Sequence, residues 1–525
     1  MIEFSALATT KLAAKLDVAA ERRFIVMGDI VTMNDTRDVV PGGRLCLADR
    51  SIVAALQPDD ALPAGFESAP VVDTGGTIYP GLFDLHNHMP YNMTPLWQVK
   101  KRYDNRLEWQ NHTDEYYSAV TAPFKLLNEK NDDPSFARAI VRFVECKGLF
   151  GGVTTGHGMN LRNKTMYEGL MRNIEQPLAA ELPVVKSQTA DFNDEKLAEM
   201  LAWTRDGQPY IYHLSEGLGA YGAKVFKFLE QAPGGLNAHL TCIHCVGIPA
   251  EGWDALTAVA GIVWSPTSNL LLYGQTCDVR QAKQRGIPVA IGADWSPSGC
   301  KNLLGELKVA RAASQHMGGV LSDADLVAAV TCVPARMVGW DSRLGSLQPG
   351  KWADLLILED VGGDHFARLV SAKETSVRAV VIDGRVRMGE AGGLVIADPL
   401  SSEDVVIGGK HYVIDLADPG TGGLGGLKLS DAIDKIRYGL AHLPELEQEH
   451  AKLALMGVES EDLGFCLEDE MMPERLSSIL RRGNTPPARP MELSPMTSVD
   501  DAAFRQAMLD SLNMPPYAKA AFKES

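Results

Sequence analysis

The sequence predicts an α/β protein built around a (β/α)8 barrel, or TIM barrel, at about residues 80–336. Two observations lead to this prediction. Along this stretch, apolar segments of strand length alternate with segments of helical periodicity, which is typical of βα units around a parallel sheet. The stretch also has about the length, roughly 250 residues, that is typical of such barrels.

A small β-sandwich is expected beside the barrel, with one half from each flank. Residues 20–79 contain short extended segments separated by turn residues, and the same texture returns at residues 337–400. The two stretches are far apart in the sequence but alike in pattern. We therefore expect them to form one composite domain.

Seven of the barrel strands can be read directly from apolar segments that end at turn residues. An eighth is expected between residues 158 and 207, because a barrel of this class has eight strands. Helical patterns fall between most of the strands, for example at 194–206. The seven expected strands are 82–88, 152–157, 183–187, 208–214, 239–244, 261–265 and 288–294.

Residues 401–525 form a C-terminal extension with amphipathic helices. Two apolar helix faces are expected in it, because their residues recur at helical spacing. These faces need to be covered, so we expect the extension to pack on the barrel or on a second subunit, and the protein to be a homodimer. The two faces consist of Ile433, Ile436 and Leu440, and of Phe504, Met508 and Leu512.

The composition argues against several classes of function. The chain has 50 Lys and Arg against 67 Asp and Glu, and the resulting net charge of −17 disfavours binding to nucleic acid or to an anionic membrane. No apolar stretch approaches the roughly 18 residues of a transmembrane helix, and no secretory signal is recognisable. Eight scattered cysteines are typical of reduced thiols. We therefore expect a cytoplasmic enzyme.

Polar side chains close several of the expected barrel strands. His86 and His88 are two residues apart, so on a strand they point to the same side. His213, His244 and Asp294 each end a later strand. Any one of them could be a hydrogen-bonded residue at a loop start, but strand ends of a barrel meet at one rim, where active sites lie. Imidazoles and a carboxylate gathered there predict a site for Zn²⁺ or Fe²⁺.

A run of landmarks now gives a more specific indication. The chain resembles the amidohydrolase superfamily, and within it the branch of cytosine deaminase, guanine deaminase and triazine hydrolase. The resemblance covers about residues 22–392. The landmarks are TIYPGLFDLHNH, GVTTGHG, HLSE, the His of TCIHC, SPTSNLLLYG, IGAD, GSLQPGKWADLLILE and VIDGRV.

The resemblance implies a metal-dependent hydrolase of a C–N bond outside peptide chains, acting on a small polar or heterocyclic substrate. It implies one metal, with Zn²⁺ preferred and Fe²⁺ as the alternative, and a water activated by that metal. It assigns Glu216 as the proton shuttle, and His244 as the residue that polarises the substrate or orients the attacking water. The implied metal ligands are His86, His88, His213 and Asp294.

Two departures from the pattern leave the substrate open. Trp295 follows Asp294 where the superfamily usually has Gly, and the segment after His88 continues into a distinctive loop, MPYNMTPLW. Trp295 and His157, which ends the GVTTGHG segment, are the candidates for contacting the substrate.

Two alternatives remain at this point. If Lys186 were carboxylated and bridged two metals, His244 would become a ligand, Asp294 could act as the base, and the enzyme would be a two-metal amidase or dipeptidase. The HxxE pattern of His213 and Glu216 favours the one-metal interpretation. The other alternative is a catalytically silent binding protein on an amidohydrolase-like scaffold.

Overall fold

The structure of the chain is a computed structural model. Some expected segments lie outside the residues that it describes: 20–22 and 392–400 of the two flanks, and 456–487 of the extension. The described residues are 23–112, 114–129, 134–159, 169–391, 401–417, 424, 426–455 and 488–523.

Eight parallel strands follow one another around the barrel in chain order. They belong to a three-stranded sheet and a five-stranded sheet. At both seams, where an edge of one sheet meets an edge of the other, a backbone hydrogen bond joins them. Asp294 N–H donates to the His86 carbonyl (2.8 Å) after β12 and β5, and Val185 N–H donates to the Ile174 carbonyl (3.0 Å) between β8 and β7. The strands are β5 (Leu82–Asp84), β6 (Val153–Gly156), β7 (Arg172–Asn173), β8 (Lys186–Gln188), β9 (Tyr210–Leu214), β10 (Leu240–His244), β11 (Gly261–Trp264) and β12 (Val289–Ile291).

The observed positions of two strands, β7 and β8, are more exact than the sequence prediction. The short strand β7 occupies the interval in which the eighth strand was expected. Strand β8 begins at Lys186, although the expected strand began at residue 183, where a proline cannot donate a backbone hydrogen bond. Lys186 therefore starts its strand and does not end it.

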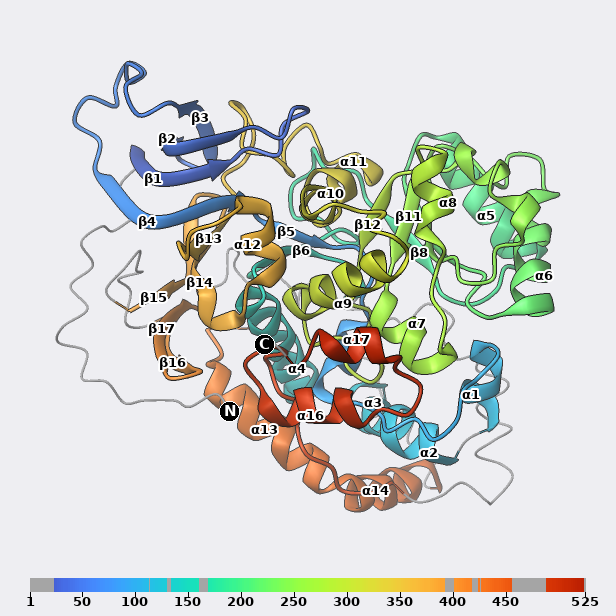
Figure 1. Cartoon of the computed structure of the whole chain (residues 1–525). Helices are drawn as coiled ribbons and strands as arrows, with labels where there is room; N and C mark the ends of the chain where they lie inside the picture. The colour runs from blue at the N-terminus through green and yellow to red at the C-terminus, as the bar shows by residue number, and fades with distance from the viewer. Residues whose placement is uncertain are drawn as a thin grey trace.

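Helices surround the barrel strands (Figure 1). Their ends use ordinary capping: Ser322 forms a capping box with Asp325, and Asn302 accepts hydrogen bonds from Leu304 and Gly305 N–H. The barrel helices are α4 (Pro134–Phe150), α5 (Asp194–Arg205), α6 (Gly219–Glu230), α7 (Pro266–Tyr273), α8 (Val279–Gln284), α9 (Leu303–His316), α10 (Asp323–Ala328) and α11 (Cys332–Met337).

A long insert separates β5 from α4. It consists of short helical turns, and two of them have π-helical hydrogen bonding, a form that is rare and frequently found at functional sites. Its elements are η1 (Met89–Met93), α1 (Arg106–His112), α2 (Asp114–Tyr116), η2 (Tyr117–Thr121), α3 (Ala122–Phe124) and η3 (Lys125–Glu129).

The two flanks of the barrel share one nine-stranded sheet, because β4 pairs antiparallel with β13. One apolar cluster draws on both flanks, including Phe24, Ile78 and Leu355. The expected arrangement as two layers of a sandwich stays a prediction, and the sheet continues past residue 400. In sheet order the strands are β16 (Ser402–Ile407), β17 (Lys410–Asp415), β15 (Arg385–Glu390), β14 (Val377–Ile382), β13 (Leu355–Glu359), β4 (Val71–Pro80), β1 (Arg23–Val31), β2 (Val39–Ala48) and β3 (Ser51–Leu56).

The C-terminal helices pack on the barrel. Helix α13 (Leu429–Ala441) contacts α4, and α17 (Pro516–Ala520) contacts α9, next to α16 (Ala502–Asp510) (Figure 1). Five of the six predicted face residues are buried. The inclusion of Leu512 was wrong: α16 ends at Asp510, so Leu512 lies beyond the helix and is 68% exposed. Helix α14 (Leu443–Leu455) follows α13 directly.

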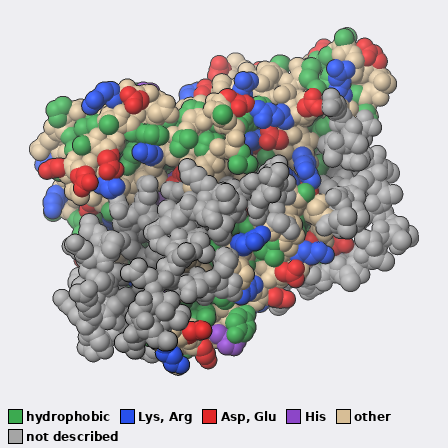
Figure 2. Space-filling view, turned by 180° about the vertical axis from the view of Figure 1, so that it is seen from behind, with side chains coloured by type: hydrophobic (Ala, Val, Ile, Leu, Met, Phe, Trp, Pro, Cys, Tyr) green, Lys and Arg blue, Asp and Glu red, His purple; other side chains and the backbone are tan. Residues whose placement is uncertain are grey.

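The surface visible in Figure 2 carries Lys, Arg, Asp and Glu side chains interspersed with apolar and neutral ones. No broad basic area stands out on the coloured part of this face. Among the described helices, none is both long and apolar enough to span a membrane.

Candidate metal centre and active site

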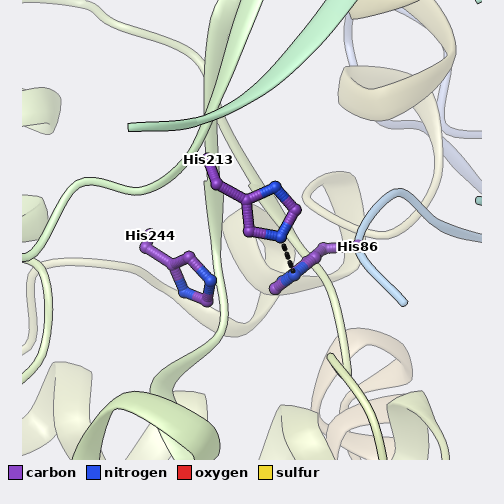
Figure 3. Close-up of side chains that lie close together, drawn as sticks. All are labelled: His86, His213 and His244. Carbon is purple, nitrogen blue, oxygen red and sulfur yellow. Dashed lines mark hydrogen bonds between the residues drawn. The ribbon is translucent and has the colours of Figure 1, made fainter. Parts of the chain in front are cut away.

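The predicted metal ligands meet at the C-terminal rim of the barrel. His86 follows β5, His213 lies in β9, His244 ends β10, and Asp294 follows β12. Their side chains converge because parallel strands of a barrel end at one rim. Figure 3 shows the rings of His86, His213 and His244 turned toward one another. All of these residues are buried, as is His88.

Several distances between the ligand atoms are close to those found around a tetrahedral metal. The Nε2 atom of His213 lies 3.1 Å from Nε2 of His86 and 3.3 Å from Nε2 of His88. The Asp294 Oδ1 atom lies 3.5 and 3.8 Å from the Nε2 atoms of His86 and His88. A tetrahedral ion with bonds of about 2.0–2.1 Å holds its ligand atoms about 3.4 Å apart. These four residues could therefore hold one divalent ion.

His244 lies beside this set. Two groups could each supply three ligand atoms within 4.8 Å of one another: one contains His86, His88 and Asp294, and the other contains His86, His213 and His244. His86 belongs to both groups, which makes it the centre of the cluster.

Hydrogen bonds on the outer ring nitrogens orient the imidazoles. Nδ1 of His86 lies 2.6 Å from Ser265 Oγ, and Nδ1 of His213 lies 3.3 Å from the Gln188 carbonyl. Both rings thereby direct Nε2 toward the other candidate ligands. In metal-binding histidines, a hydrogen bond on the other ring nitrogen commonly fixes the ring in this way. The sequence interpretation gave Ser265 and Gln188 no role, although Ser265 opens the SPTSN landmark directly after β11.

The buried setting keeps the imidazoles neutral. Burial lowers the pKa of His88 to about 4 and holds the pKa of His86, His213 and His244 well below its usual range. A neutral imidazole offers the lone pair that a metal requires, so the cluster is ready to bind an ion at neutral pH.

The backbone at the rim is strained at several of these positions. His244 has φ +67°, Asp294 has φ +58°, and Ser215 has φ +53°. Non-glycine residues seldom adopt this region, and they cluster at functional sites. Gly292 allows β12 to approach β5, because a Cβ atom there would lie 2.4 Å from His86 Cβ.

Glu216 lies next to His244 at the edge of the cluster. Its Oε2 atom is 3.6 Å from His244 Nε2 and 3.7 Å from an Arg106 guanidinium nitrogen, while its Oε1 accepts a hydrogen bond from the Tyr273 hydroxyl (2.8 Å). Tyr273 belongs to the SPTSNLLLYG landmark. Arg106 comes from the insert, and no sequence signal connected it to the site, because only folding brings α1 to the rim.

His244 has a defined tautomer in this arrangement. The Asn269 side-chain nitrogen donates to His244 Nδ1 at 2.9 Å. Since Nδ1 accepts, the neutral ring carries its proton on Nε2, which faces Glu216. His244 can therefore donate a hydrogen bond into the site.

Aromatic side chains form one wall of the site. The Trp295 ring lies 5.7 Å from the His88 ring, measured between centroids. Tyr91, Trp109 and Tyr116, all from the insert, contact Trp295 with centroid distances of 5.1 to 6.3 Å. The structure thus brings Trp295 to the ligands. It places the other substrate candidate, His157, beside Glu175, with 3.7 Å from Nε2 to a carboxylate oxygen.

The bridging role considered for Lys186 was wrong. Lys186 begins β8, is exposed, and its amine lies 4.2 Å from the Trp203 ring centroid. Gln188, two residues later, occupies the end of that strand beside His213. The prediction took Lys186 as a strand-end residue because the strand was placed too early, and the two-metal alternative loses its bridging ligand.

The chain is similar in sequence to known enzymes. The Amidohydrolase family model matches residues 228–387. A 5-methylthioadenosine/S-adenosylhomocysteine deaminase of Syntrophobacter fumaroxidans is 25% identical over 417 residues, covering 69% of this chain and 92% of the relative.

Solved structures show the same fold. Atrazine chlorohydrolase from Arthrobacter aurescens, complexed with zinc, matches with a TM-score of 0.57 and 18% identity, over 71% of this chain and 97% of its own. A zinc-bound adenosine deaminase from Xanthomonas campestris matches with a TM-score of 0.54 and 18% identity, over 80% and 98%. Together, these matches indicate an enzyme that resembles the amidohydrolase superfamily in sequence and in fold.

Proposed function

We propose that this enzyme is a metal-dependent deaminase of a planar nitrogen heterocycle. The observation that carries the proposal is the close approach of the Nε2 atoms of His86, His88 and His213 and the Asp294 carboxylate, with Glu216 beside His244. This set can hold a metal and also move a proton. A silent binding protein has no need of the second property.

The proposed ligands favour zinc. Three neutral imidazoles and one carboxylate suit Zn²⁺ first and Fe²⁺ second, and two solved structures of the same fold contain zinc. A bound ion of this kind lowers the pKa of a coordinated water to about 7 and so supplies a nucleophile at neutral pH.

Glu216 acts as the proton shuttle in this proposal. Its carboxylate takes a proton from the attacking water and delivers it to the leaving nitrogen, so that a C–O bond forms, the C–N bond breaks and ammonia leaves. The Tyr273 hydroxyl and the Arg106 guanidinium fix the direction of the carboxylate. His244 donates its Nε2–H to the ring nitrogen or oxygen on which charge develops.

The aromatic wall supports a planar substrate. Trp295 and the insert residues around it offer flat apolar faces on the side of His88. The relatives named for acting on adenosine or 5-methylthioadenosine are consistent with an aminopurine-like ring. The substrate would then be a small molecule whose ring lies against Trp295.

We also propose a cytoplasmic homodimer with the composite sandwich domain described above. Seven cysteines in the described residues are free thiols, and six of them are buried, which fits a reducing compartment. Leu512 and Tyr438 of the extension are exposed apolar or aromatic residues that a second subunit could cover. Light scattering of the purified protein reports the mass directly, and a monomer would remove the dimer proposal.

A substrate screen tests the activity. Aminopurines, aminopyrimidines, aminotriazines, lactams and N-acyl amino acids are incubated with the zinc-loaded enzyme, and release of ammonia or acid is measured. The proposal predicts ammonia from at least one aminated heterocycle. Acid release from lactams or acylated amino acids alone would show that the C–N bond cleaved is an amide.

A further inference from the structure

A buried polar cluster joins the two loops that carry the metal-binding residues. Ser296 N–H donates to Asn92 Oδ1 (2.8 Å), the Asn92 amide donates to Asn87 Oδ1 (2.9 Å), and the Asn87 amide donates to Asp84 (2.9 Å). Asp84 also accepts from Ala293 N–H (3.1 Å). These bonds close a ring that contains His86 and His88 on one side and Asp294 on the other.

Lys147 of α4 donates hydrogen bonds to two residues of this ring. Its amine donates to the Asn92 carbonyl (2.9 Å) and to Ser296 Oγ (2.5 Å), so one side chain holds both loops. Lys301 adds a third bond, from its amine to the Ser296 carbonyl (3.0 Å). Both lysines are almost completely buried.

Burying these two lysine amines is unfavourable for the stability of the folded protein. Among the described residues, no carboxylate lies within 4 Å of either amine, and burial lowers the pKa of Lys147 far below its usual range and that of Lys301 to about 7. Buried charges without a paired charge cost stability, and apolar residues of similar volume are often equal or better. Stability alone therefore does not account for them.

We propose that Lys147 and Asn92 are positioning residues for the metal centre: they clamp the loop after β5 to the loop after β12 and so set the distance between His86, His88 and Asp294. The proposal deepens the proposed function and rests on it. Outer contacts of this kind typically change metal affinity about 10- to 100-fold when they are lost.

Lys147→Met tests the clamp, with Lys308→Met as the matched control. Lys308 is a partly buried lysine of α9 that also donates to two backbone carbonyls, those of Val370 and Ala372 at the end of α12 (His365–Ser371). The zinc-loaded full-length proteins are mixed with a chromophoric chelator, and the rate of metal release is followed. Hydrogen exchange of residues 89–94 and 294–299 and melting temperatures are measured alongside.

The clamp predicts metal release about 10- to 100-fold faster in Lys147→Met, faster exchange in both loops, and a melting temperature equal to or above that of wild type. Lys308→Met should release metal within about twofold of the wild-type rate. Equal release from the two variants, with wild type holding its metal, would overturn the clamp alone. A wild-type protein that holds no metal would overturn both the clamp and the proposed function.

Ser296→Ala provides a second route if Lys147→Met does not fold. It removes only the hydroxyl that accepts from Lys147 and leaves the backbone bonds of Ser296 in place. The clamp predicts faster metal release by a few-fold. Release at the wild-type rate would count against it.

Discussion

The two halves of the barrel differ in regularity. Strands β8 to β12 form one continuous sheet with short connections and helices between them. Strands β5 to β7 form a separate three-stranded sheet, and the long insert from η1 to η3 lies between β5 and α4. The family model begins and ends outside this second half, at residues 228–387. The regular half provides His213, His244, Asp294 and Trp295, while the insert provides Arg106 and the aromatic residues that contact Trp295.

This contrast indicates that the two regions have different roles. Metal binding depends on the precise relation between strand ends, which a continuous sheet holds well. Substrate recognition depends on loops that can vary without disturbing the sheet. His86 and His88 belong to the irregular half, and the seam bond from Asp294 N–H to the His86 carbonyl ties them to the regular one.

The largest effect is expected from the regular half. His213→Ala removes a ligand whose Nε2 lies within 3.3 Å of both other proposed histidine ligands. The variant should lose nearly all bound metal and all measurable turnover. Elemental analysis checks this, with His239→Ala, an exposed histidine just before β10, as the control. Full metal retention in His213→Ala would remove His213 from the site.

Glu216→Gln separates proton transfer from metal binding. The amide keeps the size of the side chain and loses the base, so kcat should fall about 10²–10⁴-fold while the metal stays bound. Glu230→Gln, at the exposed end of α6, should leave kcat unchanged. If Glu216→Gln turns over at the wild-type rate with its metal in place, another group must carry the proton.

The aromatic wall should affect KM more than kcat. Trp295→Leu removes a flat surface that is worth about 1–3 kcal/mol per stacked ring, which corresponds to a rise in KM of roughly 5- to 150-fold. Trp203→Leu, next to Lys186 and away from the ligands, is the control. Steady-state kinetics distinguish the outcomes: a fall in kcat with unchanged KM would show that Trp295 positions Asp294 and does not bind substrate.

The smallest effect concerns the contact between the barrel and the nine-stranded sheet. Asp325 of α10 lies 3.0 Å from Arg37 and 2.9 Å from Lys283. Burial opposes its ionisation, but hydrogen bonds from Lys283 and Arg37 prevail and lower the pKa of Asp325 to about 2. The folded pKa lies below the unfolded value, so the stabilisation is present above about pH 4 and is lost as the pH falls toward 2.

Asp325→Asn should therefore lower the free energy of unfolding by about 1 kcal/mol at pH 6, a figure reduced for partial solvent exposure. The difference from wild type should be about half as large at pH 3. Urea unfolding at the two pH values measures both numbers, and kcat should not change. A difference that grows at low pH would contradict the assigned pairing.

Much of the fold could be predicted because the barrel strands are apolar and end at turn residues. β7 was not predicted as a segment, since two hydrogen-bonded residues carry no periodicity. The start of β8 was misplaced by three residues, and this single shift produced the wrong role for Lys186. Leu512 was misassigned because periodicity does not show where a helix stops.

Some residues of the site could also be predicted from the sequence, and others could not. Histidines that end successive strands could be predicted to meet, because the barrel brings all strand ends together. Arg106, Asn92 and Lys147 could not, since they reach the rim from an insert and from an outer helix. Their positions depend on tertiary packing, and neither spacing nor residue type in the sequence signals it.

The metal content of the purified wild-type protein tests the central claim most directly. Elemental analysis after removal of loosely bound ions should find one zinc or iron per chain, and the count should fall to near zero in His213→Ala. Two metals per chain, or none with the fold intact, would contradict a single site formed by His86, His88, His213 and Asp294.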